Sequence, residues 1–224
     1  MAGTTRLQLF NDSLMLCGER FLASLTEDRE PRRQLDQAWA SNGVRYCLEQ
    51  GQWQFAMRTQ QIDADTAIDP QFGYQNAFDK PTDWVLTSAV CSDERFNVPL
   101  TQYSDEMGYW LADIDPIYVK YVSDDAAYGG DLPLWPATFC DYVAAYFASK
   151  VINKITSDKD KITFLLGQPG KIGGGELGRR LKIAKSRAGM TQPTRFPAQG
   201  SWPLARGGRG GTRRDRGNTG SLTG

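Results

Sequence analysis

The chain has 224 residues, 40% of them hydrophobic, which is enough to build one large domain or two small ones around a buried core. It contains no histidine, which excludes Ser-His-Asp and Cys-His catalysis and most zinc sites. The formal net charge is zero, but residues 191–224 hold six arginines and one aspartate, so this tail carries +5 and residues 1–190 carry −5. An acidic body argues against a domain that grips DNA by counterion release.

The N-terminal part of the chain predicts two helices. The first covers about residues 5–17 and ends at Gly18, a typical C-cap residue. The second covers about residues 31–51, with Pro31 in its first turn. One face of the first helix carries apolar residues at steps of three and four: Leu7, Phe10, Leu14 and Cys17.

The pattern changes to short strands over about residues 84–122. The segments "WVLTSAV", "YWLAD" and "IYVKYV" are β-branched or aromatic and partly alternate, and prolines separate them. In the last segment Ile117, Val119 and Tyr121 share one face. We expect a small antiparallel sheet inserted into a helical protein.

Helices return after the strands. The strongest periodic signal predicts a helix over about 136–155, and "SDKD" resembles a capping box that opens a helix over about 158–189. A glycine-rich kink interrupts that last helix. The apolar row of the 136–155 helix repeats every four residues: Phe139, Val143, Phe147, Val151 and Ile155.

The predicted fold class is α+β: a helix-dominated bundle of about four helices, an inserted small antiparallel β-sheet and an extended C-terminal arm. Residues 1–190 form the body. Residues 191–224 are rich in Gly, Pro, Arg, Ser and Thr and cannot bury enough apolar surface to fold alone, so they form the arm.

The four cysteines are widely separated and include no C-x-x-C pair. We expect reduced, buried thiols, which fits assembly in a bacterial cytoplasm. No secretion signal is recognised, and no window approaches the ~18 apolar residues of a membrane span, so we expect a soluble protein. The cysteines are Cys17, Cys47, Cys91 and Cys140.

The segment Gly167–Gly178, "GQPGKIGGGELG", suggests a phosphate-binding loop. A Walker A motif needs four residues between its first glycine and Gly-Lys, and then Ser or Thr. Here two residues intervene, Ile172 replaces the hydroxyl, and the preceding "ITFLL" belongs to a helical pattern. We interpret the segment as a kink or loop and expect no nucleotide cofactor.

Paired aspartates could be imagined as metal ligands, but none forms an EF-hand loop, so turn and cap roles are favoured. A second role is left open, in which acidic residues form a wall that repels passing DNA. The pairs are Asp63/Asp65, Asp113/Asp115, Asp124/Asp125 and Asp158/Asp160.

Aromatic residues of the strand region could stack nucleic-acid bases, but few basic residues lie between them, so packing in a core or interface is favoured. No catalytic constellation is present, and we expect neither an enzyme nor a metal protein. These aromatic residues are Trp84, Tyr109, Trp110, Tyr118 and Tyr121.

The order of these pieces resembles the tail tubular protein A, or head-to-tail adaptor (connector), family of tailed bacteriophages over roughly residues 7–190. The resemblance is carried by "CGERFLASLTEDRE", "GQWQFA", "PQFGYQNAFDKPTDW", "IDPIYVKYV" and "LPLWPATFCDYVAAYFASKVI". It implies a structural subunit of a ring, generally of twelve copies, between the portal and the tail tube or nozzle in the virion. Genomic DNA would pass through the bore without sequence-specific binding, and no membrane is involved.

The resemblance also implies that the arm extends onto the portal protein, while a tail component such as a tubular protein B-like nozzle binds the body. Isolated apolar anchors between prolines suit a groove of a partner ring. The alternative is an RNA- or single-strand-binding protein that acts through "RGGRGGTRRDRG". The expected portal-docking residues are Phe196, Trp202, Leu204, Arg206, Arg209, Arg213 and Arg214.

Overall fold

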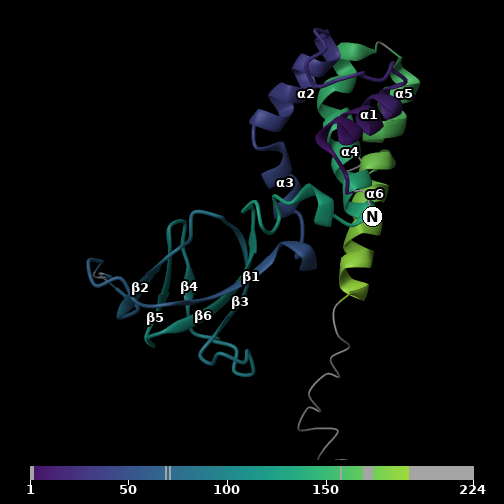
Figure 1. Ribbon diagram of the computed structural model, residues 1–224. Helices are drawn as coiled ribbons and strands as arrows, with labels where there is room; N and C mark the ends of the chain where they lie inside the picture. Colours follow the sequence, from purple (N-terminus) through teal and green to yellow (C-terminus); the bar gives the residue numbers. More distant parts are fainter. Residues whose placement is uncertain (1–2, 69, 71, 157, 169–173, 192–224) are drawn as a thin grey trace, which may run out of the picture. The chain divides into compact units, whose positions relative to one another are not determined.

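The computed structural model describes residues 3–191 apart from residues 69, 71, 157 and 169–173. The chain divides into the units Met1–Thr191 and Gln192–Gly224, and every described element lies in the first. These elements include six α-helices and two three-stranded antiparallel sheets (Figure 1). The predicted α+β class is therefore confirmed.

Helix α4 (Ala137–Ile155) lies at the centre of the helical part, and each of the other five helices contacts it. Its predicted apolar row is confirmed: Phe139, Val143, Phe147 and Val151 are buried, and Ile155 at its end is partly buried against the same core. Helix α1 (Arg6–Cys17) packs along it. Gly18 ends α1 in the left-handed conformation, as its sequence position predicts.

Two of the predicted helices are each two helices in the structure. The expected 31–51 helix is α2 (Glu30–Ala40) followed by α3 (Gly43–Glu49), because Asn42 turns the chain with a φ of 60°. A Cβ on Gly43 would lie 2.6 Å from the Ala38 carbonyl oxygen, so only glycine fits this turn.

The expected 158–189 helix is α5 (Lys159–Leu166) followed by α6 (Gly175–Met190). Gly167 and Gly175, with φ values of 87° and 69°, stand at the two sides of the break. The N-cap of α5 is Asp158, whose carboxylate accepts from the amides of Asp160 and Lys161, and not Ser157 as the predicted capping box required. With six helices, the described chain is not clearly a four-helix bundle.

The strands form two sheets, where the sequence predicted one. The first has the order β1 (Met57–Ile62), β6 (Ile117–Ser123), β3 (Trp84–Cys91), and the second has the order β2 (Asn76–Asp79), β5 (Tyr109–Ala112), β4 (Ser104–Asp105). Strands β1 and β2 lie before the predicted 84–122 insert, so that boundary is wrong. The strand "MRTQQI" was missed because it is polar and half-exposed along most of its length.

Each part has its own core. Ile117, Val119 and Tyr121 of β6 are buried together with Phe78 and Trp110, which confirms the predicted common face. The other end of the first sheet belongs to the helical core. That core includes Met57, Val85, Leu86 and Val122.

The turn after β6 has no space for a side chain at Gly129. A Cβ there would lie 2.2 Å from the Ser123 carbonyl oxygen and 3.0 Å from Leu48. We expect Gly129→Ala to lower the free energy of unfolding by about 1–3 kcal/mol, because backbone atoms cannot move aside. Urea denaturation would measure this loss. Gly108→Ala, where the added Cβ meets open space, is the matched control and should change little.

All four cysteines are buried and form no disulfide, as predicted. Burial raises the pKa of the Cys17 thiol to about 11, which makes this group unreactive. No helix in the described part of the chain combines the length and apolar character needed to cross a membrane.

Candidate interaction surfaces

The residues expected to dock on a portal all lie outside the described part of the chain. Phe196, Trp202, Leu204 and the arginines from 206 to 214 follow Thr191, the last described residue. Their role stays a prediction. The surface from which the arm departs is described, and it is the C-terminal turn of α6.

The glycine-rich segment is described only at its two sides, because residues 169–173 lie outside the described part. The preceding "ITFLL" belongs to helix α5, as predicted, and α6 begins at Gly175. A phosphate loop of the Walker type follows a β-strand. The chain around this segment has a helix in that place.

Three of the eight paired aspartates have the predicted turn or cap role, namely Asp65, Asp125 and Asp158. Among the described residues, no three metal-ligating side chains lie together as a metal site would require. Asp124 is different, because it forms an ion pair with Arg45 of α3. Backbone amides donate to five of the other carboxylates: Ala67 to Asp65, Gln75 to Asp113, Ala64 to Asp115, Ala127 to Asp125, and Asp160 and Lys161 to Asp158.

The predicted core role is confirmed for two of the five strand-region aromatics, while Trp84 and Tyr118 are partly buried and Tyr109 is 37% exposed. Trp110 and Tyr121 are fully buried, and Trp84 packs against Trp110 edge to face. The ammonium of Lys80 lies 3.8 Å from the Trp84 ring centroid and pairs with Asp105. Lys80 and Trp110 thus occupy part of the Trp84 ring, and the core interpretation holds for Trp110 and Tyr121.

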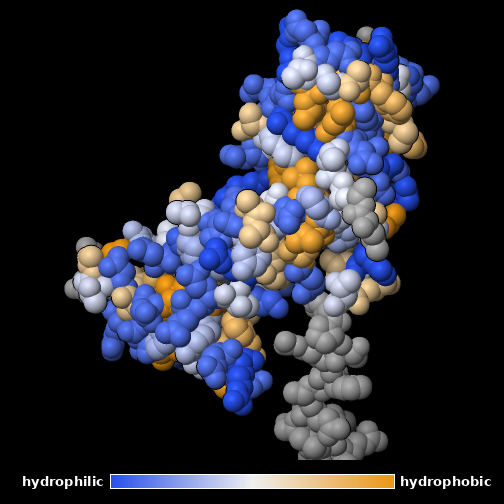
Figure 2. Space-filling view, viewed as in Figure 1, coloured by the Kyte–Doolittle hydropathy of each residue, from blue (hydrophilic) through white to orange (hydrophobic). Residues whose placement is uncertain are grey.

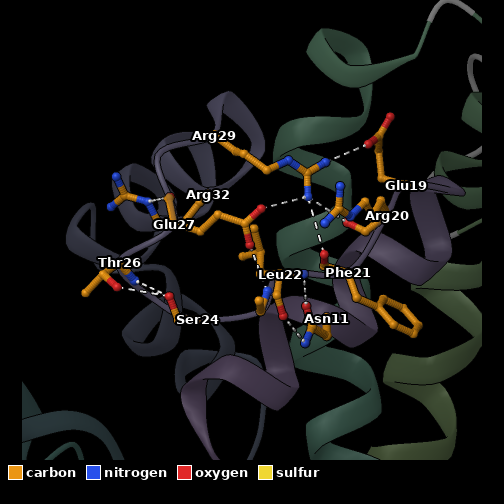
Figure 3. Close-up of polar contacts among 11 residues, drawn as sticks. Asn11, Glu19, Arg20, Phe21, Leu22, Ser24, Thr26, Glu27, Arg29 and Arg32 are labelled. Atoms are coloured by element: carbon orange, nitrogen blue, oxygen red, sulfur yellow. Dashed lines mark hydrogen bonds and ion pairs between the residues drawn. The ribbon is translucent and has the colours of Figure 1, made fainter.

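Polar side chains form several hydrogen bonds and ion pairs within the connection between α1 and α2 (Figure 3). The Asn11 amide bonds both the amide and the carbonyl of Leu22, and the Arg29 guanidinium donates to the carbonyls of Arg20 and Phe21. Arg29 also pairs with Glu19 and Glu27. The Phe21 ring points away from this network and is 54% exposed.

An apolar groove of about 360 Å³ lies beside the C-terminal half of α6. Trp53 and Phe55 come from the segment that leads into β1, Phe139 comes from the start of α4, and Ala184 and Ala188 come from α6. Phe139 lies 4.8 Å from both Trp53 and Phe55, measured between ring centroids. Arg187 and Thr191 stand at the same groove, so it opens where the described chain ends.

Charge is divided between the two parts of the body. Residues 57–124 hold 12 acids and 4 bases, a net charge of −8, whereas residues 150–190 hold 10 bases and 3 acids, a net charge of +7. Figure 2 shows a mostly hydrophilic surface over the strand region, with apolar side chains gathered more over the helices. The body is therefore strongly polarised, a property that its total charge of −5 hides.

Two arginines hold Glu176 in its ionised form at the start of α6. Arg179 donates from Nε and Nη2 at 2.7 and 2.6 Å, and Arg180 donates from Nε at 2.8 Å. These bonds, chiefly that from Arg179, outweigh burial and lower the pKa of Glu176 to about 2 from an ordinary value near 4.5. Because the folded pKa is the lower one, the stabilisation is present above about pH 4.5 and is lost as the pH falls towards 2.

Glu176→Gln is expected to lower the free energy of unfolding at pH 7 by about 1–2 kcal/mol, a value reduced for the solvent exposure of Arg179. The difference from the unmodified chain should shrink as the pH falls below 4.5, because the carboxylate of the unfolded chain then takes up a proton while that of the native chain, with a pKa of about 2, is still ionised. Denaturation at pH 7 and pH 3 would measure both values. Glu94→Gln, at an exposed glutamate, is the control. An equal loss at both pH values would contradict this account.

No protein-family model matches the chain, and no curated protein matches it significantly. The resemblance to head-to-tail adaptors accordingly rests on the quoted residues.

The sequence-based interpretation missed the groove. Its residues come from three segments that are far apart in the chain: Phe139 and the end of α6 were assigned only to local helices, and "GQWQFA" was named only as part of the resemblance. The aromatic residues Trp53 and Phe55 in "GQWQFA" were one signal that could have pointed to it. Residues two apart in the chain lie on different faces of a helix, so two aromatics at this spacing indicate packing by a non-helical segment. Phe72, 87% exposed in the connection between β1 and β2, was also passed over.

Proposed function

We propose that this chain is a structural subunit that forms a ring at the head-to-tail junction of a tailed bacteriophage. In this proposal the body, residues 1–190, builds the ring, and residues 191–224 dock on the portal protein. DNA passes through the bore, and the ring presents a surface for the next tail component.

The observation that carries the proposal is the change in composition at the end of α6, from a chain that builds a helical core to a basic segment with isolated apolar residues. The described helical core draws on residues between Leu7 and Ala188, and α6 ends at Met190. The segment that follows carries +5 and the isolated anchors Phe196, Trp202 and Leu204. We therefore expect a body that folds without the arm, and an arm that orders against a partner.

Truncation after Met190 tests the docking role. The shortened chain should keep the thermal unfolding midpoint of the full chain but lose binding to the portal protein of the same phage, measured by co-sedimentation. Portal binding that survives the truncation would refute the docking role.

Two full-length variants then separate the contributions of the arm. Serine at the three anchors Phe196, Trp202 and Leu204 should abolish portal binding, since buried apolar anchors dominate such interfaces. Glutamine at the arginines from 206 to 214 should weaken binding mainly at low salt, where exposed charges are least screened.

The alternative, nucleic-acid binding through the arm, is supported by the +5 charge of residues 191–224. It predicts that a synthetic 191–224 peptide binds a labelled single-stranded oligonucleotide tightly, with an affinity that falls steeply with salt. Our proposal predicts weak binding to the same probe at physiological salt. Fluorescence anisotropy over a salt series distinguishes the two functions.

A further inference from the structure

We propose that the groove beside α6 receives Phe72 of a neighbouring copy, and that this contact joins one subunit to the next in the ring. The inference rests on the proposed ring. It assigns an occupant to the groove, a second copy of this chain, and it names the two surfaces that meet.

The groove is built to accept an aromatic side chain. It is lined by Trp53, Phe55 and Phe139 and by Ala184 and Ala188 of α6. Trp53 and Phe139 are almost fully buried and form its floor, so the partly exposed Phe55 ring is the one that offers an aromatic contact, and the small side chains of α6 leave space beside it. A volume of about 360 Å³ is at the lower end for a ligand pocket, which suits one large side chain.

Phe72 has the opposite character. It is 87% exposed, although it is one of the most apolar side chains of the strand region. It lies three residues before Gln75, whose amide donates to Asp113, in the connection that leads into β2. An exposed aromatic side chain is a typical anchor for a partner surface.

The charges around the two features are complementary. The chain near Phe72 carries the exposed carboxylates Asp63, Asp113 and Asp115, which we call the acidic end. Sheet register places them together. The last residue of β1, Ile62, pairs with the first of β6, Ile117, and the Asp115 carboxylate accepts from the Ala64 amide at 3.0 Å.

Arg187 stands at the groove, and Lys182 and Lys185 lie on the same exposed stretch of α6. Among the described residues, none of these three bases and none of the carboxylates of the acidic end forms an ion pair. Uncompensated charges of opposite sign on two surfaces favour contact between copies and fix its orientation.

Phe72 and the groove lie at different places on one chain, so their contact between two copies is heterologous. Each copy then offers one Phe72 and one groove, so the contact repeats from copy to copy and closes into a ring when the rotation between neighbouring copies allows it. A ring needs this type of interface, because a two-fold contact would stop at a dimer.

The test is Phe72→Ser, with Met107→Ser as the matched control. Met107 is 98% exposed and lies in the β4–β5 turn, at the Asp79–Tyr109 end of the second sheet, whereas Phe72 is near the Asn76–Ala112 end. Mass photometry of the full chain over a concentration series should show assembly by the unmodified chain and by Met107→Ser. Phe72→Ser should assemble about thirty-fold more weakly or not at all, with an unchanged thermal midpoint.

Disulfide cross-linking identifies the occupant directly. A Phe72→Cys chain mixed with a Thr138→Cys chain should give a mixed disulfide dimer on oxidation, because Thr138 lines the groove. The native cysteines are buried and do not compete. Mass spectrometry of the linked peptides confirms the pair.

Three outcomes would overturn the inference: an unmodified chain that stays a single copy at every concentration, a Phe72→Ser chain that assembles normally, or an oxidised mixture that contains no disulfide between the cysteines introduced at positions 72 and 138. A normal ring from Phe72→Ser would leave the proposed adaptor function standing, since that function is tested separately by portal binding of the truncated chain.

Discussion

Asp83→Ala is expected to lower the free energy of unfolding at pH 7 by about 3 kcal/mol, the lower end of the range for breaking a buried ion pair. The Asp83 side chain is 12% exposed and accepts from Arg58 at 2.9 Å and from the hydroxyls of Ser123 and Tyr121. Alanine would leave these donors without their shared acceptor. The lower end applies because Arg58 is one third exposed and keeps some contact with water.

The pH dependence of this loss follows from the same contacts. Burial alone would raise the pKa of Asp83, but the hydrogen bonds from Ser123 and Arg58 outweigh it and hold the pKa below its ordinary value near 3.8. The stabilisation by the carboxylate is therefore present above about pH 4 and disappears as the pH falls through the lowered native pKa. The difference between the unmodified chain and Asp83→Ala should be largest at pH 7 and smaller at pH 3.

Urea denaturation followed by tryptophan fluorescence measures both values. Asp79→Ala, at an exposed aspartate at the end of β2, is the control and should stay within about 0.5 kcal/mol of the unmodified chain. An Asp83→Ala chain as stable as this control would show that the network contributes nothing net.

Asp83 has a further importance, because its network lies where strands meet helices. Its backbone carbonyl accepts from the Asp124 amide, and the Asp124 carboxylate pairs with Arg45 of α3. Arg45 also donates to the carbonyl of Trp84. Charged side chains and backbone carbonyls therefore connect α3 with β3 and β6, in addition to the apolar core that these elements share.

Local pattern was enough to predict some elements. The rows of α1 and α4 repeat over three or more turns, and their residues face one core, so period and burial agree. The break between α2 and α3 was missed, although "SNG" at 41–43 is a turn signal in the middle of a helical stripe. There the apolar positions continue on both sides, because α2 and α3 both pack on α4.

The pairing of strands into two sheets could not be predicted from local pattern. Strand β6 lies between β1 and β3, which are 22 residues or more apart in the chain, and this order depends on contacts that no single segment contains. The groove is even harder to predict from local pattern, because its lining comes from three distant segments: Trp53 and Phe55, Phe139, and the end of α6. The arm residues could be named from composition, but a concave surface needs the tertiary structure.

Phe147→Ala is expected to be the most damaging single change in the helical core, with a loss of about 3–5 kcal/mol in the free energy of unfolding. The ring is fully buried and stacks on Trp39 of α2 at 5.7 Å, with an interplanar angle of 16°. It also meets Phe10 of α1 edge to face at 6.2 Å. Alanine would leave a cavity between three helices and remove both aromatic contacts.

The place of Phe147 also predicts which part of the chain loosens. Its ring lies 2.9 Å from the Cβ position of Gly43, so it supports the turn between α2 and α3 as well as α2 itself. Hydrogen exchange of Phe147→Ala should therefore rise more in α2 and α3 than in β5, whose Trp110 belongs to the other core. Phe164→Ala, at a 62% exposed phenylalanine of α5, deletes the same atoms without a cavity and should cost less than about 0.5 kcal/mol. Equal losses from the two substitutions, or a uniform rise of exchange, would mean that α2 is not held by this aromatic cluster.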